Sequence, residues 1–438
     1  MKQLISKKSH KLRLTLRLPG DKSLSHRAAI FSSIATGVSR IGNFLLSEDC
    51  LNTMRIFKQM GVRIKKVNSS TYVFYGQGIA ALKEPKDDLY CGNSGTTMRL
   101  LSGLLSGLPF KSRLKGDASL HSRPMNRIIL PLKQMGANII AEGQGGRAPL
   151  LIEGKKLKGI KHTLAVPSAQ VKSSMILAAL SSSVNIQINE PIATRDHTET
   201  YLRAAKVPIK TASKKITLKP TSKIQPVSWV VPGDISSAAF LLGAAALVPD
   251  SKIKIKDVLY NKHRIGFVRC LKKMGVALTI QKNKKVGPET TATITAAYNK
   301  NLKPITVQED EVPSMIDELP MLMVVATQAH GQSIIHGIEE LRVKETNRVD
   351  SMVNQLRKMG ANIEVKKNSI YIEGPNQLKG ATIQSFGDHR TAMSFVIAGF
   401  VATGKTQIKN IECIATSFPE FTRLFRKAGA KLVTSSKN

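Results

Sequence analysis

The segment Leu271-Lys-Lys-Met-Gly-Val276 decides the fold, because similar segments recur along the chain of 438 residues. Each copy is typical of the end of an amphipathic helix, a glycine that ends it and the start of an alternating strand. The glycine stands at Gly61, Gly136, Gly275, Gly360 and Gly429, and a sixth, degenerate copy has Lys206 in its place. These positions are 69 to 85 residues apart. The spacing predicts six α/β units.

A second, more apolar helix is expected upstream in every unit. The residues at which these helices are predicted to begin are all of types preferred as N-caps. They are Asp21, Asn93, Ser168, Asp234, Asp317 and Asp388. The runs behind them, such as 175–180 and 240–246, are apolar on most sides, which is typical of helices inside a domain.

A further repeat groups the six units in two sets of three. Pro19-Gly20-Asp21 recurs 213 residues later as Pro232-Gly233-Asp234. The duplication predicts an α/β protein with two similar domains of three units each. One domain is expected to span residues 20–230 and the other residues 1–19 plus 231–438, with a hinge at the two crossovers.

Composition excludes several classes of protein. With 42% hydrophobic residues, 31 Gly and 19 Pro, the chain is neither disordered nor fibrous. Its four cysteines are far apart, which argues against a disulfide framework or a zinc module. The basic N-terminus is followed by no apolar signal segment, and no apolar run approaches the length of a membrane span. We expect a cytoplasmic protein without a metal or cofactor.

The net charge of +36 raises the question of nucleic acid as a partner. A large positive charge attracts polyanions and speeds encounter with anionic substrates. However, the basic residues are scattered in pairs, and aromatic residues make up only 5% of the chain. Without a stacking platform or a recognition helix, specific nucleic-acid binding is a remote alternative.

Several of the predicted helix starts carry groups that suit an anion. A helix N-terminus presents free N–H groups and partial positive charge. Lys22, Ser23 and Arg27 follow the first start, Gly92-Asn93-Ser94-Gly95-Thr96 forms the second, and Ser168-Ala169-Gln170 forms the third. Each of these residues taken alone is more simply explained as a helix N-cap than as a ligand contact. Their occurrence at several equivalent starts favours a phosphate or carboxylate site.

Two further clusters add cations. Arg123 stands before Pro124, and a guanidinium can clamp phosphate or carboxylate with two hydrogen bonds. In Arg342-Val-Lys344-Glu345-Thr-Asn-Arg348, a helix would bring Lys344 and Arg348 to one face and Glu345 next to Arg348. A surface ion-pair helix is the alternative interpretation of this cluster.

Four ordered motifs resemble those of the 5-enolpyruvylshikimate-3-phosphate (EPSP) synthase family. They are residues 18–27, Gly92–Thr96 with Arg99, Arg342–Thr346 and Asp388–Arg390. Residues 168–173 and 194–198 look more like the second bacterial subclass. The resemblance covers the whole chain and implies two domains, each of three βαβαββ units, an inside-out α/β barrel of the enolpyruvyl transferase type.

The resemblance implies a transfer of the enolpyruvyl group of phosphoenolpyruvate to the 5-hydroxyl of shikimate 3-phosphate, with release of phosphate. It also implies a monomer and a target of glyphosate. The residues that would bind shikimate 3-phosphate are Lys22, Ser23, Arg27, Ser168, Ala169, Gln170, Arg195, Asp317 and Lys344. Those that would bind phosphoenolpyruvate are Lys22, Asn93, Gly95, Thr96, Arg123, Gln170, Arg348 and Arg390.

By the same resemblance, Asp317 is the base for the 5-hydroxyl, Glu345 is the acid that protonates the methylene carbon, and Lys22 lies near the transferred proton. Nearby cations suit an ionised base but oppose the raised pKa that an acid needs. The sequence leaves open which carboxylate protonates the carbon.

The chain departs from the family pattern at Thr416, where many members have Lys, and has Glu340 and Ala169 where the first subclass has Asn and Ser. The sister family that transfers enolpyruvate to UDP-N-acetylglucosamine is the nearest alternative. That family normally has a Cys in the loop aligned with residues 116–124, and this chain has none there.

Overall fold

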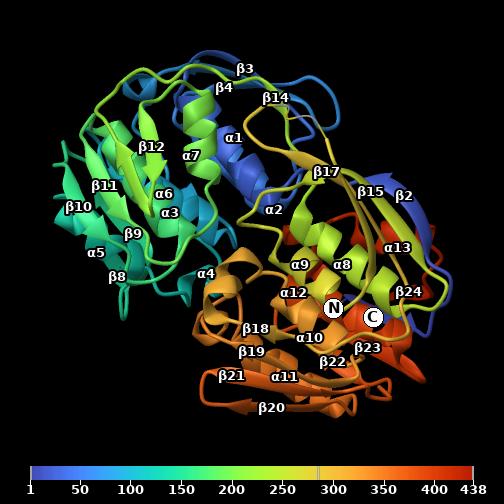
Figure 1. Ribbon diagram of the computed structural model, residues 1–438. Coiled ribbons are helices and arrows are strands. Elements are labelled where there is room, and N and C mark those ends of the chain that lie inside the picture. The colour runs from blue at the N-terminus through green and yellow to red at the C-terminus, as the bar shows by residue number, and fades with distance from the viewer. Residues whose placement is uncertain (1, 284, 286, 437–438) are drawn as a thin grey trace. The chain divides into compact units, whose positions relative to one another are not determined.

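The computed structural model describes residues 2–283, 285 and 287–436. The chain divides into two compact units (Figure 1). Unit 1 comprises residues 1–18, 232–284 and 290–438, and unit 2 comprises residues 19–231 and 285–289. The short segment 285–289 therefore clusters with unit 2, although the chain on either side of it belongs to unit 1. Nothing in the sequence predicts this excursion.

Unit 2 contains three four-stranded sheets and seven helices among its described residues. In sheet order the strands are β14 (Trp229–Val230), β3 (Thr36–Gly42), β5 (Tyr72–Gln77) and β4 (Arg63–Lys66); β6 (Leu89–Tyr90), β7 (Lys111–Lys115), β9 (Arg147–Glu153) and β8 (Asn138–Gly143); and β10 (Ile160–Thr163), β11 (Ile186–Asn189), β13 (Lys215–Leu218) and β12 (Ile209–Ala212). The helices are α1 (Lys22–Ile34), α2 (Glu48–Gln59), α3 (Gly95–Ser106), α4 (Ala118–His121), α5 (Asn126–Gln134), α6 (Ala169–Ser181) and α7 (His197–Ala204).

Unit 1 repeats this plan with three more sheets. Their strands are β2 (Arg13–Arg17), β15 (Lys252–Leu259), β17 (Thr291–Ala297) and β16 (Ala277–Lys282); β18 (Thr306–Val307), β19 (Gly331–His336), β21 (Ser369–Gly374) and β20 (Asn362–Lys366); and β22 (Thr382–Gln384), β23 (Lys405–Lys409), β1 (Lys2–Lys7) and β24 (Leu432–Ser436). The helices are α8 (Ile235–Leu247), α9 (Gly266–Lys273), α10 (Leu319–Ala326), α11 (Arg348–Lys358), α12 (His389–Val401) and α13 (Phe421–Lys427).

All six sheets have the same hydrogen-bonding pattern. The first strand pairs parallel with the second, and the other two pairings are antiparallel. A parallel pair needs a crossover, which one α-helix supplies between β6 and β7, β10 and β11, β18 and β19, and β22 and β23. The parallel pairs β14/β3 and β2/β15 join strands from distant parts of the chain. The predicted fold class, two sets of three βαβαββ units, is confirmed.

The repeated glycine ends a helix in a left-handed conformation, as the sequence predicts. Its φ angle lies between 86° and 101° in all five copies. Lys206, in the degenerate copy, adopts φ 61° at the equivalent point. A side chain in this region is strained, so the fold imposes the conformation even where glycine is missing.

The upstream helices form the core of each unit. All described residues of α8 are buried, and α12 is buried from His389 to Phe400. In unit 2, α3 crosses α6 so closely that a Cβ on Gly103 would lie 1.9 Å from the carbonyl oxygen of Ser174. Such close backbone approach fixes one helix against the other, and with them the residues at their N-termini.

Four of the six predicted N-caps are confirmed and two are wrong. The side chains of Asp21, Ser168, Asp234 and Asp388 accept hydrogen bonds from their helix N-termini. Helix α3 is capped by Ser94 instead of Asn93, because the Asn93 side chain bonds to neighbouring loop residues. Helix α10 begins after Glu318, with Pro320 in its first turn, and Asp317 lies outside it.

Residues 342–347 do not form the helix that a shared face of Lys344 and Arg348 would require. Helix α11 starts only at Arg348, where the side chain of Asn347 accepts hydrogen bonds from the backbone N–H groups of Val349 and Asp350. Lys344 and Arg348 therefore share no helical face. The predicted contact between Glu345 and Arg348 is nevertheless present.

Candidate active site

In unit 2 the N-terminal turns of α1, α6 and α7 meet around the buried guanidinium of Arg27. Its Nε donates to Thr198 Oγ1 at 2.8 Å and its Nη2 donates to Ser173 Oγ at 3.0 Å. A third bond, 3.1 Å long, runs from Nη1 to the backbone oxygen of Ser23. Arg27 is only 3% exposed. Its orientation is fixed by three elements, which suits a residue that must present a positive charge at a set place.

The N-termini of α3 and α6 are joined by the amide of Gln170. Its oxygen accepts from Arg99 Nη1 at 2.7 Å, and its nitrogen donates to Thr96 Oγ1 at 3.0 Å. Two predicted residues, Thr96 and Gln170, are thus brought together. Arg99, a motif residue to which the sequence analysis gave no role, holds the Gln170 amide in place.

The loop before α3 is tied to Arg123. Asn93 Oδ1 accepts a 2.5 Å hydrogen bond from Arg123 Nη2, and the Asn93 amide nitrogen donates to Asp117 Oδ2 at 2.8 Å. Gly95 lies beside these cations. A Cβ on Gly95 would lie 3.0 Å from Arg99 Nη1 and 3.3 Å from Arg123 Nη1. Glycine therefore keeps open the space next to two guanidinium groups.

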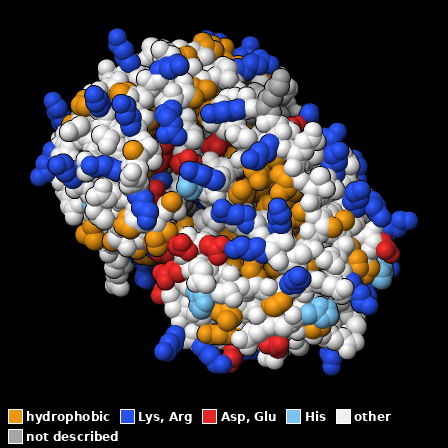
Figure 2. All heavy atoms as spheres, in the orientation of Figure 1, with side chains coloured by type: hydrophobic (Ala, Val, Ile, Leu, Met, Phe, Trp, Pro, Cys, Tyr) orange, Lys and Arg blue, Asp and Glu red, His pale blue; other side chains and the backbone are white. Residues whose placement is uncertain are grey.

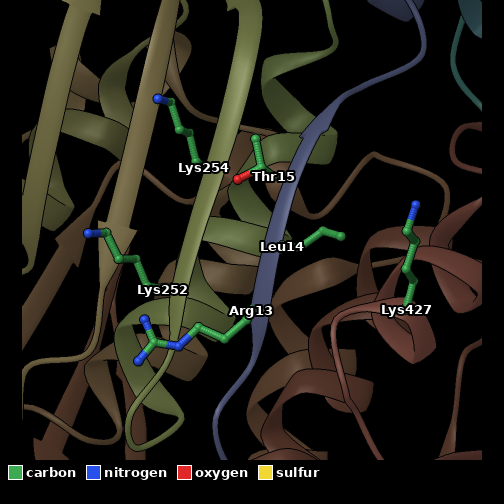
Figure 3. Close-up of a pocket in the computed structure, with 6 residues that line it drawn as sticks. All are labelled: Arg13, Leu14, Thr15, Lys252, Lys254 and Lys427. Atoms are coloured by element: carbon green, nitrogen blue, oxygen red, sulfur yellow. The ribbon is translucent and has the colours of Figure 1, made fainter.

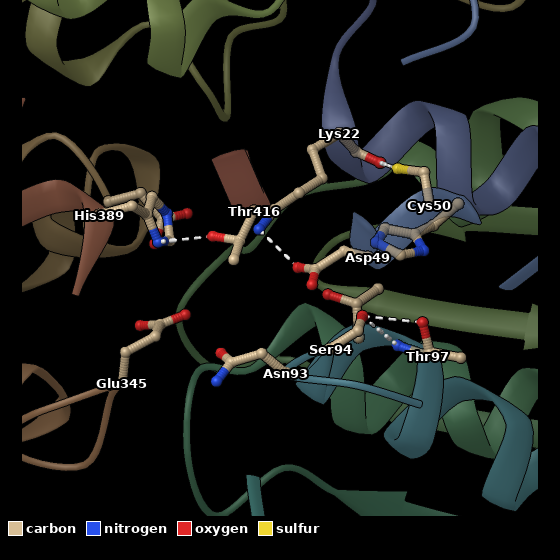
Figure 4. Close-up of polar contacts among 12 residues, drawn as sticks. Lys22, Asp49, Cys50, Asn93, Ser94, Thr97, Glu345, His389 and Thr416 are labelled. Atoms are coloured by element: carbon tan, nitrogen blue, oxygen red, sulfur yellow. Dashed lines mark hydrogen bonds and ion pairs between the residues drawn. The ribbon is translucent and has the colours of Figure 1, made fainter. Parts of the chain in front are cut away.

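Lys22 forms an ion pair with Asp49 of α2, with 2.9 Å between Nζ and Oδ2 (Figure 4). The Lys22 side chain is 17% exposed and that of Asp49 is 7% exposed, so the pair is only partly accessible. Burial lowers the pKa of His26 well below its ordinary value, and the charges of Lys22 and Arg27 lower it further. The neutral His26 Nδ1 lies 2.8 Å from Thr53 Oγ1. Sequence reasoning missed Asp49, because no motif links α2 to Lys22.

The segment that leads to Arg195 is held in place by a buried cluster of charged residues. Lys172 of α6, only 1% exposed, lies 2.9 Å from Glu190 and 2.8 Å from Glu199. Glu190 also accepts a 3.1 Å hydrogen bond from the backbone N–H of Thr194. Burial lowers the pKa of Lys172, but the two carboxylates outweigh it and raise the pKa overall. Arg195 is half-buried next to this anchored residue.

In unit 1 the site is organised by Arg348, which is 1% exposed. Its Nε donates to Asp388 at 2.7 Å, its Nη1 to Asp317 at 3.3 Å and its Nη2 to Glu345 at 2.7 Å. Burial lowers the pKa of Arg348, but these three carboxylates outweigh it and raise the pKa overall. The two predicted catalytic carboxylates, Asp317 and Glu345, are thus held by one guanidinium.

Lys344 lies in the same cluster and is half-buried. Burial lowers its pKa to about 8, an effect that Asp317 and Glu340 oppose and Arg348 reinforces. Glu340, the departure from the first subclass, therefore helps to keep Lys344 charged. An amine with this pKa changes its charge near neutral pH.

The start of α12 carries His389 and Arg390, both buried. Thr416 Oγ1 lies 3.4 Å from His389 Nδ1 and donates to the backbone oxygen of Cys413 at 2.7 Å (Figure 4). The guanidinium carbon of Arg390 lies 5.9 Å from the ring centre of Phe240. Thr416 thus caps its own turn, and the side chain lacks the charge that Lys would bring to this position.

The fold described above is similar to those of solved structures of known proteins. An EPSP synthase from Acinetobacter baumannii has a similar structure, with a TM-score of 0.88, 41% identity and full coverage of both chains. The enolpyruvyl transferase NikO from Streptomyces tendae matches with a TM-score of 0.81 at 17% identity, a likeness of fold alone. The fold is that of the enolpyruvyl transferases.

Sequence comparisons narrow the class further. Residues 6–425 match the family EPSP synthase (3-phosphoshikimate 1-carboxyvinyltransferase). Relatives named 3-phosphoshikimate 1-carboxyvinyltransferase include one from Shouchella clausii, 44% identical over 96% of this chain and 97% of its own. Another, from Alkaliphilus oremlandii, is 44% identical over 94% of this chain and 96% of its own. The chain belongs to the EPSP synthase family.

All four cysteines have free thiols. Among the described residues, no helix is long and apolar enough to cross a membrane.

Proposed function

We propose that this chain transfers the enolpyruvyl group of phosphoenolpyruvate to the 5-hydroxyl of shikimate 3-phosphate and releases phosphate. The observation that carries the proposal is the contact of one buried guanidinium, that of Arg348, with both Asp317 and Glu345. An addition to an enol phosphate needs a base for the attacking hydroxyl and an acid for the carbon that gains the proton. Arg348 holds both candidate carboxylates in fixed positions.

The reaction balances as an addition followed by an elimination. The 5-hydroxyl oxygen bonds to C2 of phosphoenolpyruvate as Asp317 takes its proton, while C3 gains a proton from Glu345 and becomes a methyl group. Glu345, now a carboxylate, then takes a proton from that methyl group, which re-forms the double bond as the C2–O bond to phosphate breaks. The proton held by Asp317 passes to the leaving phosphate. Lys22 is proposed to lie near the transferred proton and to stabilise charge on both substrates.

Shikimate 3-phosphate is proposed to bind residues that present positive charge, hydroxyl groups or backbone N–H groups. The fixed guanidinium of Arg27 and the anchored segment of Arg195 suit a phosphate, since bidentate guanidinium contacts are strong and directional. The full proposed set is Lys22, Ser23, Arg27, Ser168, Ala169, Gln170, Arg195, Asp317 and Lys344.

Phosphoenolpyruvate is proposed to bind the N-terminus of α3 and the cations around it. Gly95 leaves room there, and Arg123 is oriented by Asn93. Arg348 uses four of its five N–H donors on described carboxylates, so one is left for a ligand. The full proposed set is Lys22, Asn93, Gly95, Thr96, Arg123, Gln170, Arg348 and Arg390.

The test is an assay of phosphate release that requires both substrates together. Release with either substrate alone, or an unchanged rate after Asp317→Asn, would contradict the proposal. UDP-N-acetylglucosamine serves as the competing acceptor and is expected to give no product. Activity with it alone would favour the sister reaction instead.

The proposal includes a monomer that works in the cytoplasm, with a hinge between domains at residues 19–20 and 230–231. Light scattering after size-exclusion chromatography tests the monomer. Small-angle scattering with and without both substrates tests the hinge, because closure lowers the radius of gyration. An unchanged radius would argue against a large closure.

A further inference from the structure

One sheet of unit 1 has a solvent face whose charged side chains, on β2 and β15, are almost all basic. The four strands β2, β15, β17 and β16 contain six basic residues, one acidic residue and no aromatic residue. The acidic residue, Asp257, is paired with Arg17 at 2.6 Å. The other five basic residues therefore have no balancing carboxylate from the four strands.

The strand register places five of these six cations in two rows on the same side, whereas Lys282 is in register with the buried Ala292 and belongs to the other side. Strand β2 lies at the sheet edge and pairs parallel with β15, so that Arg13 lies beside Lys252 and Arg17 beside Lys256. The alternate residues Ile253 and Ile255 are fully buried and face the core. Side chains two residues apart point to the same face. We call the exposed residues Arg13, Thr15, Arg17, Lys252, Lys254, Lys256 and the adjoining Lys427 the basic sheet face.

The face is hollowed where α13 ends beside β2. The backbone N–H of Arg13 donates to the carbonyl oxygen of Ala428 at 3.0 Å, which holds the end of α13 against the strand. A hollow of about 490 Å³ lies there (Figure 3). Arg13, Lys252, Lys254 and Lys427 line it together with Leu14 and Thr15. Within the described part of the chain, none of these four cations forms an ion pair.

We propose that the basic sheet face binds the phosphate backbone of single-stranded nucleic acid without reading its bases. Same-facing residues on a strand are about 6.6 Å apart, a spacing comparable with that of successive phosphates in an extended nucleic-acid strand. Phosphates joined directly by P–O–P bridges are much closer together. The strands of the sheet contain no aromatic side chain on which a base could stack, so the proposed contacts are made only to the phosphates of the nucleic acid.

This surface uses none of the residues proposed for catalysis, so it constitutes a separate function. Lys and Arg side chains are spread over the whole visible face of the protein (Figure 2), and general charge attraction must be distinguished from a local site.

The test compares two variants with equal net charge. One is Lys252→Gln/Lys254→Gln/Lys427→Gln. The control, Lys65→Gln/Lys66→Gln/Lys210→Gln, removes three exposed lysines from unit 2.

The experiment measures the affinity for a labelled uridine homopolymer over a series of NaCl concentrations. Each phosphate contact contributes about 0.7 to the slope of log K against log[salt] for a single strand. The face variant is expected to lose about 2 from this slope and roughly 10- to 100-fold in affinity at about 0.1 M salt. The control is expected to keep the slope. Both are expected to keep the turnover and melting temperature of the original protein.

Equal losses of slope in the two variants, or no loss in the face variant, would overturn the proposal. So would tighter binding, per phosphate, of inorganic polyphosphate than of the homopolymer, since that result would assign the face to a different polyanion. Turnover is assayed separately, so failure of this proposal leaves the enzymatic one intact.

Discussion

Arg348 Nη2 lies 2.7 Å from Glu345 Oε2, and the same guanidinium reaches Asp317 through Nη1. The acid and the base proposed for one reaction are therefore positioned by a single side chain. Arg348 is itself fixed by Asp388, the N-cap of α12. The relative position of the two carboxylates thus depends on a helix start 40 residues further along the chain.

Asp317→Asn and Glu345→Gln are each expected to lower kcat by about 10²- to 10⁴-fold, the usual contribution of general acid–base catalysis. The amides keep the shape of the side chains, so KM for both substrates is expected to change far less. Glu339→Gln, at an exposed position of the short helix 339–341, is the matched control, and its kcat should be close to normal. A near-normal kcat in either site variant would show that the residue does not have the proposed catalytic role.

Lys344 is expected to give the affinity for shikimate 3-phosphate a pH dependence. Its pKa of about 8 means that the amine is charged below that pH and neutral above it. If the charged form binds the anionic substrate, KM is constant at lower pH and rises as the pH increases through about 8. Lys344→Arg keeps its charge in this range and is expected to abolish the rise. A KM profile identical in the two proteins would contradict this.

Gly95→Ala is expected to weaken binding of phosphoenolpyruvate and of glyphosate, which we expect to compete for the same site. The added methyl group would crowd Arg99 and Arg123. Crowding of this kind costs about 1–3 kcal/mol, or about 5- to 150-fold in KM or Ki. Steady-state kinetics with each ligand measure the effect, and KM for shikimate 3-phosphate serves as the internal control. Glyphosate that fails to compete with phosphoenolpyruvate in the unaltered protein would refute the shared site.

Lys172→Met is expected to lower the free energy of unfolding by about 3–5 kcal/mol, because it leaves Glu190 and Glu199 as buried charges without their partner. The combined variant Lys172→Met/Glu190→Gln/Glu199→Gln removes all three charges and is expected to recover most of that loss. Urea unfolding of both variants measures the difference. Equal stability of the single and combined variants would show that the charges are not coupled.

Much of the local structure could be predicted from the sequence, since it depends on neighbours along the chain. The glycine-terminated helices and the caps at Asp21 and Ser168 follow from residue types within one turn. The two wrong caps, Asn93 and Asp317, occur where the side chain bonds to a distant partner instead. In both cases tertiary contacts outweighed the local preference.

The same distinction applies to the candidate site. Residues in compact motifs, such as Lys22, Gly95 and Arg348, could be named from the resemblance. Asp49, Asp117 and Lys172 were given no role from the sequence. They hold Lys22, Asn93 and the segment before Arg195 in place through partners distant in the chain, which local sequence does not reveal.

The sequence by itself determined that six similar α/β units follow one another. The helix ends that mark each unit depend on residues close together in the chain, so they can be recognised from the sequence. Only the tertiary structure decided which strands complete them. Strand β14 closes a sheet with β3, about 190 residues earlier, while β1 and β2 complete sheets formed from the second half of the chain. The pattern of a strand such as β2 shows which of its sides is apolar, but the backbone hydrogen bonds of these strands can be made with any strand of suitable direction. Their partners are therefore fixed by which apolar faces the packed helices leave to be covered.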